Sequence, residues 1–157
     1  PIDGSRPSRV SLAPRSLTSA EQRLYSAVMV PPPSSVAETL VTRGAEVPST
    51  DALAATARGF GGRVDALPMG ALVVTFVAGG TATDQAARAA RCALALRALT
   101  PDEQVTLATG WGHDARRTTS GEVIDRAAAL ALLAPTARGG AVPIRIDDTT
   151  AGLRGLR

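Results

Sequence analysis

The segment Gly121-Glu122-Val123-Ile124-Asp125-Arg126-Ala127-Ala128-Ala129-Leu130 is the most distinctive run of residues in this chain. We interpret it as part of one helix over residues 121–133. A strand is predicted before it, over residues 105–109. After it, Gly139-Gly140 indicates a turn into a last strand over residues 141–146, and Asp147 or Asp148 is placed to cap a terminal helical turn.

The middle of the chain contains the clearest predicted helix, over residues 84–99. Thr83 is placed to cap its first turn, and Asp84 is favoured at the positive end of the helix dipole. Two strands are expected before this helix, over residues 63–67 and 71–77, with Pro68-Met69-Gly70 as the tight turn between them.

The first third of the chain begins with the composition of a linker. Residues 1–16 are rich in Pro, Ser and Arg, so we assign them to a linker and residues 17–157 to one folded domain. Thr18 and Glu21 have the spacing of a capping box. A strand over residues 24–30 follows, and Pro31-Pro32-Pro33 ends it because proline has no N–H for a strand ladder.

Two short helices are expected between this strand and the hairpin. One covers residues 35–43 and is closed by Gly44; the other covers residues 51–58, capped by Thr50 and closed by Gly59. The order of predicted elements is therefore β, α, α, β, β, α, β, α, β. This order favours an α+β fold, with a largely antiparallel sheet and the helices on one face.

Composition argues against several classes of protein. The 157 residues suit one domain, and 45% of them are hydrophobic although only 3% are aromatic. The formal charge of +3 comes from scattered arginines, which do not form the clustered basic face of a nucleic-acid-binding protein. Because there is no apolar run of about 18 residues and no signal-peptide pattern, we expect no membrane partner and a cytoplasmic location. The chain begins at Pro1 rather than Met, which suggests a piece of a longer protein.

The order of these segments resembles the class III adenylate and guanylate cyclase homology domain, which implies a ferredoxin-like core with extra helices. The resemblance is carried by residues 21–30, 61–76, 84–97, and 105–112 with 121–130 and the final strand. The runs ATDQAARAARCALALRAL (residues 82–99) and GEVIDRAAAL (residues 121–130) are similar to degenerate cyclase-like domains of large bacterial signalling proteins. Such domains follow a Ser/Thr kinase domain or precede ATPase regions.

The resemblance also locates six catalytic positions. A class III cyclase uses two Asp carboxylates to hold two divalent ions, a Lys and an acidic residue to read the base, and an Asn and an Arg to orient the ribose and stabilise the transition state. By register with this family, these positions fall, in that order, on Pro31, Met69, Asp65, Thr118, Asp125 and Ala129. None carries the expected residue, and the chain contains no Lys and no Asn. Since the family builds each active site from two subunits and both halves are altered here, the resemblance implies no metal, no cofactor and no turnover.

Three residues, Asp65, Asp125 and Trp111, are open to two interpretations. Asp65 is either a metal ligand or, as we favour, a solvated carboxylate. Asp125 either binds a ligand hydroxyl or, as we favour, pairs with an arginine across an interface. Trp111 is either a core residue or an interface anchor, and Arg126 is a further candidate interface residue.

Two other groups of residues have weaker claims to chemistry. Cys92 is the only cysteine, which excludes an internal disulfide, and its alanine-rich surroundings favour a small buried apolar residue over a catalytic thiol. The charged residues His113, Asp114, Arg116 and Arg117 could meet phosphates, but an exposed loop is the simpler interpretation.

We therefore expect a catalytically inactive regulatory domain of a bacterial signalling protein. It would form a homodimer or dock on adjacent kinase or ATPase domains. The alternatives are a sensor that binds a nucleotide or small ligand without turnover, and a residual cyclase. A sensor needs a polar, partly basic cleft near residues 65–70 and 109–126, whereas Leu67 and Met69 favour a cleft filled by side chains.

Overall fold

The computed structural model describes residues 23–32, 49–77, 79–112, 121–133, 142–153 and 155. Several predicted features lie outside these residues: the linker over 1–16, the Thr18–Glu21 capping box, the helix over 35–43, Thr118, the charged residues His113 to Arg117, and the Gly139-Gly140 turn.

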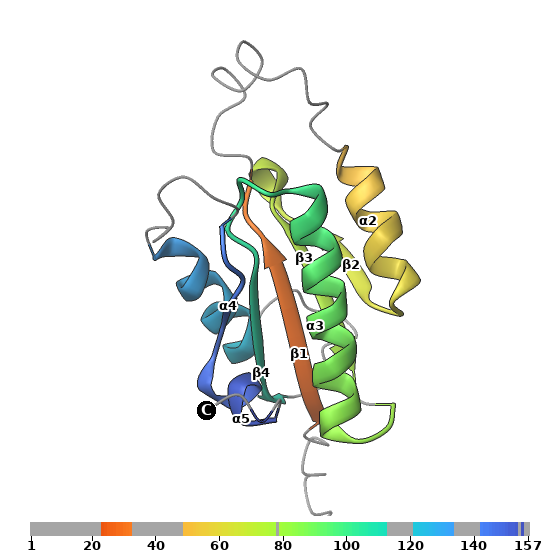
Figure 1. The fold of residues 1–157 in the computed structure, drawn as a ribbon, viewed down its shortest axis with the longest axis vertical. Helices are drawn as coiled ribbons and strands as arrows, with labels where there is room; N and C mark the ends of the chain where they lie inside the picture. Colours follow the sequence, from red (N-terminus) through yellow and green to blue (C-terminus); the bar gives the residue numbers. More distant parts are fainter. Residues whose placement is uncertain are drawn as a thin grey trace, which may run out of the picture.

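A five-stranded sheet forms the centre of the molecule (Figure 1), with the strand order β2-β3-β1-β4-β5. The strands are β1 (Arg23–Val30), β2 (Arg63–Ala66), β3 (Leu72–Val77), β4 (Thr106–Gly112) and β5 (Arg145–Ile146). The central strand β1 is antiparallel to β3 and β4, β2 is antiparallel to β3, and only β4 and β5 are parallel. The largely antiparallel sheet and the α+β class are confirmed.

The helices of the described residues are α2 (Thr50–Gly59), the short 3₁₀ helix η1 (Pro68–Gly70), α3 (Ala82–Leu99), α4 (Glu122–Leu132) and α5 (Asp148–Leu153). Two predicted caps were wrong by one or two residues. Ser49, not Thr50, accepts the N–H of Ala52 at the start of α2. Thr81, not Thr83, caps α3, because its hydroxyl accepts the Asp84 N–H and donates to the Asp84 carboxylate.

The last strand is shorter than predicted. Only Arg145 and Ile146 pair with β4, although a strand over residues 141–146 was expected. Pro143 has no N–H to donate, and the N–H of Val142 is used by the carbonyl of Pro101. The strand predicted over residues 105–109 was also too short, because β4 extends to Gly112 along β1.

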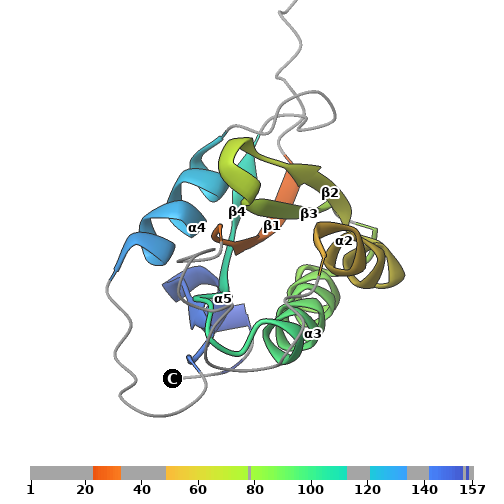
Figure 2. The same cartoon turned by 90° about the horizontal axis from the view of Figure 1, so that it is seen from above.

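Helices cover both faces of the sheet, which corrects the expectation that they would lie on one. On one face, α2 and α3 contribute Leu53, Cys92 and Leu96 to a core with strand residues such as Val28 and Phe76. On the other face, the buried residues of α4 are Val123, Ile124 and Ala127, which pack against β1, β3 and β4 (Figure 2). The reason lies in β1, where every residue from 24 to 30 is buried, so both of its faces need a cover.

The Gly61-Gly62 pair before β2 is required by close packing. A Cβ on Gly62 would collide with the side chains of Val74 and Phe76, and Gly61 has a φ of 77°. These two residues bring the chain from α2 onto the edge of the sheet. Within the described residues, no helix is long and apolar enough to cross a membrane.

Candidate functional site

The sheet brings the two expected metal positions together at one end. Val30, the last residue of β1, pairs with Leu72 of β3, and Leu72 pairs with Ala66 of β2. Pro31 therefore follows β1 beside the η1 turn, whose backbone contains Met69. The side chain of Pro31 has no oxygen to offer a metal.

Asp65 is the acidic residue of β2, and its carboxylate is already paired. Its Oδ1 lies 3.1 Å from Nη2 of Arg63, which stands two residues earlier on the same face of the strand. Both side chains are partly exposed, so the pair is a surface ion pair of small energy. In this structure the Asp65 carboxylate is part of a partly exposed ion pair.

The described residues do not fit a two-metal centre. No group of three or more His, Cys, Asp or Glu side chains within them lies close enough to hold a metal ion. A divalent cation such as Mg²⁺ needs one or two carboxylates held toward it, with water and phosphate filling the remaining sites. At the end of β1 the chain offers Pro31, and on the hairpin it offers an aspartate neutralised by arginine.

Asp125 and Ala129 lie on the outward side of α4. They are four positions apart, so they share a face, and both are exposed. Figure 1 shows α4 along the side of the sheet, whereas the η1 turn lies at its end. One chain therefore does not bring Asp125 and Ala129 to Pro31, and the methyl group of Ala129 cannot replace a guanidinium in stabilising phosphate charge.

Arg126 is held inside its own chain, a contact that the sequence did not predict. Its Nη2 donates to the carbonyl of Thr109 at 3.0 Å, and its Nη1 lies 3.6 Å from Oδ2 of Asp147. Gly110 makes this possible, because a Cβ at that position would overlap the Arg126 guanidinium. No signal along the chain links residues 110, 126 and 147, since only folding brings β4, α4 and the last strand together.

Asp147 connects the C-terminal segment to the sheet. Its carboxylate accepts the N–H of Thr109 at 3.2 Å and the N–H of Thr150 at 3.0 Å, in addition to its ion pair with Arg126. The first contact replaces a strand partner that β5 is too short to provide, and the second caps α5. The prediction of a cap at Asp147 or Asp148 is thus confirmed for Asp147.

A buried chain of hydroxyl groups continues from this point through the molecule. The hydroxyl of Thr109 lies 3.0 Å from that of Ser26 and accepts the hydroxyl of Thr150 at 2.9 Å. Gln85 of α3 donates its amide to the carbonyls of Leu24 and Phe76, at 3.1 and 3.0 Å, and so joins α3 to β1 and β3. All of these side chains are buried, which assigns them to support of the fold.

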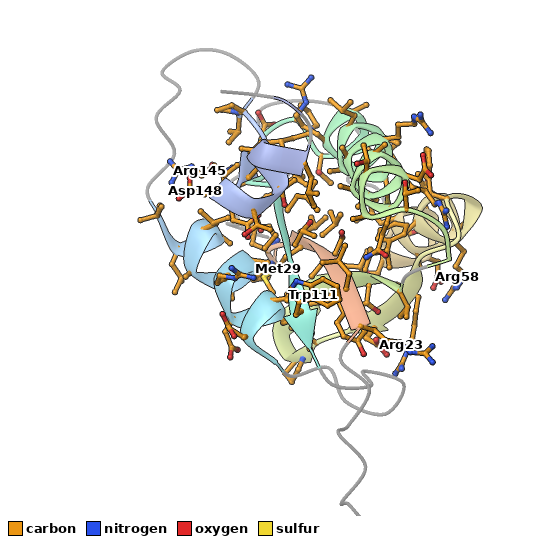
Figure 3. All side chains as sticks on the ribbon, turned by 90° about the horizontal axis from the view of Figure 1, so that it is seen from below. Arg23, Met29, Arg58, Trp111, Arg145 and Asp148 are labelled. Atoms are coloured by element: carbon orange, nitrogen blue, oxygen red, sulfur yellow. The ribbon has the colours of Figure 1, made fainter. Side chains whose placement is uncertain are left out.

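Trp111 is not a core residue. It is 64% exposed near the end of β4, where it stands opposite Leu24 of β1 (Figure 3). Among the described residues it leaves the largest aromatic surface in water, which is the property of an interface anchor.

Cys92 is fully buried in the core beneath α3, as its surroundings predicted. Burial raises the pKa of its thiol to about 12, so almost no thiolate exists at neutral pH. A nucleophilic cysteine needs its thiolate form and contact with substrate. The raised pKa disfavours the thiolate of Cys92, and burial keeps the side chain from solvent.

Comparison with known proteins identifies the fold. No family model matches the chain, and a search of curated proteins finds no significant match. Solved structures do match. The guanylyl cyclase Cya2 gives a TM-score of 0.61 at 15% identity, covering 87% of this chain and 80% of its own. The adenylyl cyclase CyaB from P. aeruginosa matches with a TM-score of 0.60 at 16% sequence identity. The match covers 85% of this chain and 81% of the CyaB chain.

A third match is the guanylyl cyclase domain of the RhoGC fusion protein from the aquatic fungus Blastocladiella emersonii, with a TM-score of 0.60 at 14% identity over 85% of this chain and 86% of its own. That domain has been crystallised as a monomer and as a dimer. The chain therefore has the fold of class III adenylyl and guanylyl cyclase domains. At this level of identity the likeness concerns the fold alone.

Proposed function

We propose that this chain is a catalytically inactive, cyclase-like regulatory domain of a multidomain bacterial signalling protein, which acts by forming a homodimer or by docking on neighbouring kinase or ATPase domains. The observation that carries the proposal is the chemistry at the end of β1 and on α4. By the resemblance to cyclases, Pro31 and Ala129 stand at the positions of a metal-binding carboxylate and a catalytic guanidinium, and neither side chain has a polar atom.

Two charged residues of the described segments, Asp65 and Arg126, are engaged in contacts of their own. Asp65 is paired with Arg63, and Arg126 is turned onto the Thr109 carbonyl and Asp147. The side chains of Pro31 and Ala129 could neither hold a metal nor neutralise the negative charge that a pyrophosphate leaving group develops. A second subunit of the same chain would supply the same substitutions, so dimerisation would not restore the site.

The test is a cyclase assay joined to calorimetry. We expect no cyclic nucleotide from ATP or GTP with Mg²⁺ or Mn²⁺ above the level of a buffer blank. Product formation that disappears in Asp65→Asn would overturn the proposal, because that carboxylate is the remaining metal-ligand candidate among the described positions. The matched control is Asp148→Asn, which changes an exposed carboxylate away from the hairpin.

Calorimetric titration with ATP, GTP and their cyclic products separates an interaction domain from a sensor. An interaction domain gives no binding heat at millimolar nucleotide. A dissociation constant of about 1–100 µM without turnover would establish the sensor and displace the interaction domain as the conclusion.

A further inference from the structure

The outer strand β2 carries a charge pattern that is complementary to a second copy of itself. In the described sheet β2 is the outermost strand and pairs on one side with β3 (Figures 1 and 2). An edge strand presents N–H and C=O groups that another strand can pair with, unless the edge is blocked. No proline or bulge interrupts Arg63–Ala66.

The two charges of β2 lie on the same face and have opposite signs. Arg63 and Asp65 are two residues apart, and Val64 between them points to the other face, where it packs against the core beneath α2 and α3. If a second β2 pairs antiparallel about a twofold axis at Val64, Arg63 stands opposite Asp65 of the second copy, and Asp65 stands opposite its Arg63. Opposite charges directly across an antiparallel pair are stabilising.

We propose that β2 is a homodimerisation edge, where two copies join antiparallel about Val64 into one continuous sheet. This inference deepens the proposed dimerisation and depends on it. The contact is isologous, so it closes after two copies. A parallel, in-register pairing of two β2 strands would set Arg63 against Arg63 and Asp65 against Asp65. The repulsion between these like charges disfavours the parallel pairing.

Within the part of the chain that the structure describes, no further strand lies beyond β2. The pairing is limited to Arg63–Ala66, because Gly62 before it is buried and its N–H is donated to the carbonyl of Ala57. The exposed residues of the neighbouring helix α2 include the small residues Ala52, Ala55 and Gly59 as well as the charged residues Asp51 and Arg58. A strand of four residues makes a small interface, so we expect a weak, transient dimer.

The test is charge exchange measured by sedimentation equilibrium of the whole chain from about 1 µM to about 1 mM. Arg63→Asp and Asp65→Arg each place like charges opposite one another, and each should weaken the homodimer about tenfold or more. The double variant R63D/D65R restores opposite charges and should dimerise like the wild type. Circular dichroism verifies that each variant is folded.

Mixing the two single variants tests the antiparallel β2 pairing specifically, because other dimer geometries do not predict that the two variants bind each other. Chains with Arg63→Asp and chains with Asp65→Arg should form a heterodimer. The first chain carries an acidic side chain at both positions and the second carries a guanidinium at both, so each facing pair has opposite charges. The matched controls are Arg91→Asp and Asp148→Arg, which alter exposed charges away from β2 and should leave dimerisation unchanged, alone or mixed.

Two outcomes would overturn this inference, and they bear differently on the proposed function. A wild-type dimer that is indifferent to the charge exchanges would exclude β2 as the interface while leaving dimerisation intact. A wild-type chain that stays monomeric throughout would exclude both this edge and homodimerisation. The absence of turnover is tested separately by the cyclase assay.

Discussion

At the scale of single residues, Arg126 makes contacts that join separate parts of the chain. The side chain passes over Gly110, donates to the Thr109 carbonyl and approaches the Asp147 carboxylate. It therefore joins α4, β4 and the C-terminal segment. A guanidinium held in this way supports the fold.

Gly110→Ala should destabilise the protein by about 1–3 kcal/mol, because the new methyl group overlaps the Arg126 guanidinium. The measurement is the free energy of unfolding from urea titration. The control is Gly79→Ala, where the added Cβ has no atom within 4 Å and the effect should stay small.

The double variant G110A/R126A isolates the cause of this loss. With the guanidinium gone, the alanine at position 110 should cost much less than it does in the wild type, giving a coupling energy of about 0.5–3 kcal/mol. Additive losses would mean that the methyl group collides with something other than Arg126.

At the scale of elements, Gln85 fixes the long helix α3 on the sheet. Its amide donates to one carbonyl of β1 and one of β3, and it is 2% exposed. Both acceptors are carbonyl oxygens, so the position requires a donor. Sequence periodicity located α3 but gave no reason to single out this glutamine.

Gln85→Glu should be more damaging than Gln85→Ala, although glutamate has nearly the shape of glutamine. At neutral pH it directs a buried carboxylate at two carbonyl oxygens, and we expect a loss of about 3–5 kcal/mol. Gln85→Ala loses the hydrogen bonds without adding a charge, so about 1–3 kcal/mol is expected.

The pH dependence of the glutamate variant identifies the charge as the cause. Burial raises the pKa of the new carboxyl in the folded state above its unfolded value of about 4.3, so the folded state binds the proton more tightly. Stability relative to Gln85→Ala should recover as the pH falls toward about 4 and be lost as it rises. A loss that is equal in acid and at neutral pH would show that shape, and not charge, is responsible.

At the scale of the whole molecule, two hydrophobic cores lie on opposite faces of the sheet, and β1 contributes to both. The core under α2 and α3 encloses Cys92, and the core under α4 encloses Ala27, Met29 and Val73. Since β1 contributes to both cores, opening either one exposes the central strand. We therefore expect the domain to unfold as one cooperative unit.

Cys92 should report this cooperativity. Its thiol should react with a disulfide reagent at a rate set by global unfolding, so urea should accelerate the reaction in step with the loss of circular dichroism. A rapid reaction in the native state would show that α3 opens locally.

The thiol also makes stability depend on alkaline pH in a defined direction. Because burial raises its pKa from 9.0 to about 12, unfolding releases a proton above pH 9. The stabilising difference is complete below pH 9 and is lost as the pH rises toward 12, by up to about 1.4 kcal/mol per pH unit. Cys92→Ala should remove this component, so the pH slopes of the variant and the wild type should differ between about pH 9 and pH 11.

The sequence by itself determined the class of the fold and the order of the strands and helices that the structure describes. Periodicity, glycine and proline are local signals, and they located the β2–β3 hairpin, α3 and α4 to within a few residues. The resemblance of residues 121–130 then gave Asp125 and Ala129 their place. What a neighbouring chain would add to this domain was not readable from such signals.

Only the tertiary structure decided which face each helix covers and which polar groups meet. The contacts of Arg126 with Asp147, of Ser26 with Thr109 and of Gln85 with Phe76 join residues that are distant along the chain or belong to different elements. Such contacts form because buried polar groups must find partners once the sheet excludes water, and the partners available depend on how the strands are ordered. The ion pair of Arg63 with Asp65 is local, but its position on an outer strand, where a second copy can reach it, follows from the strand order alone.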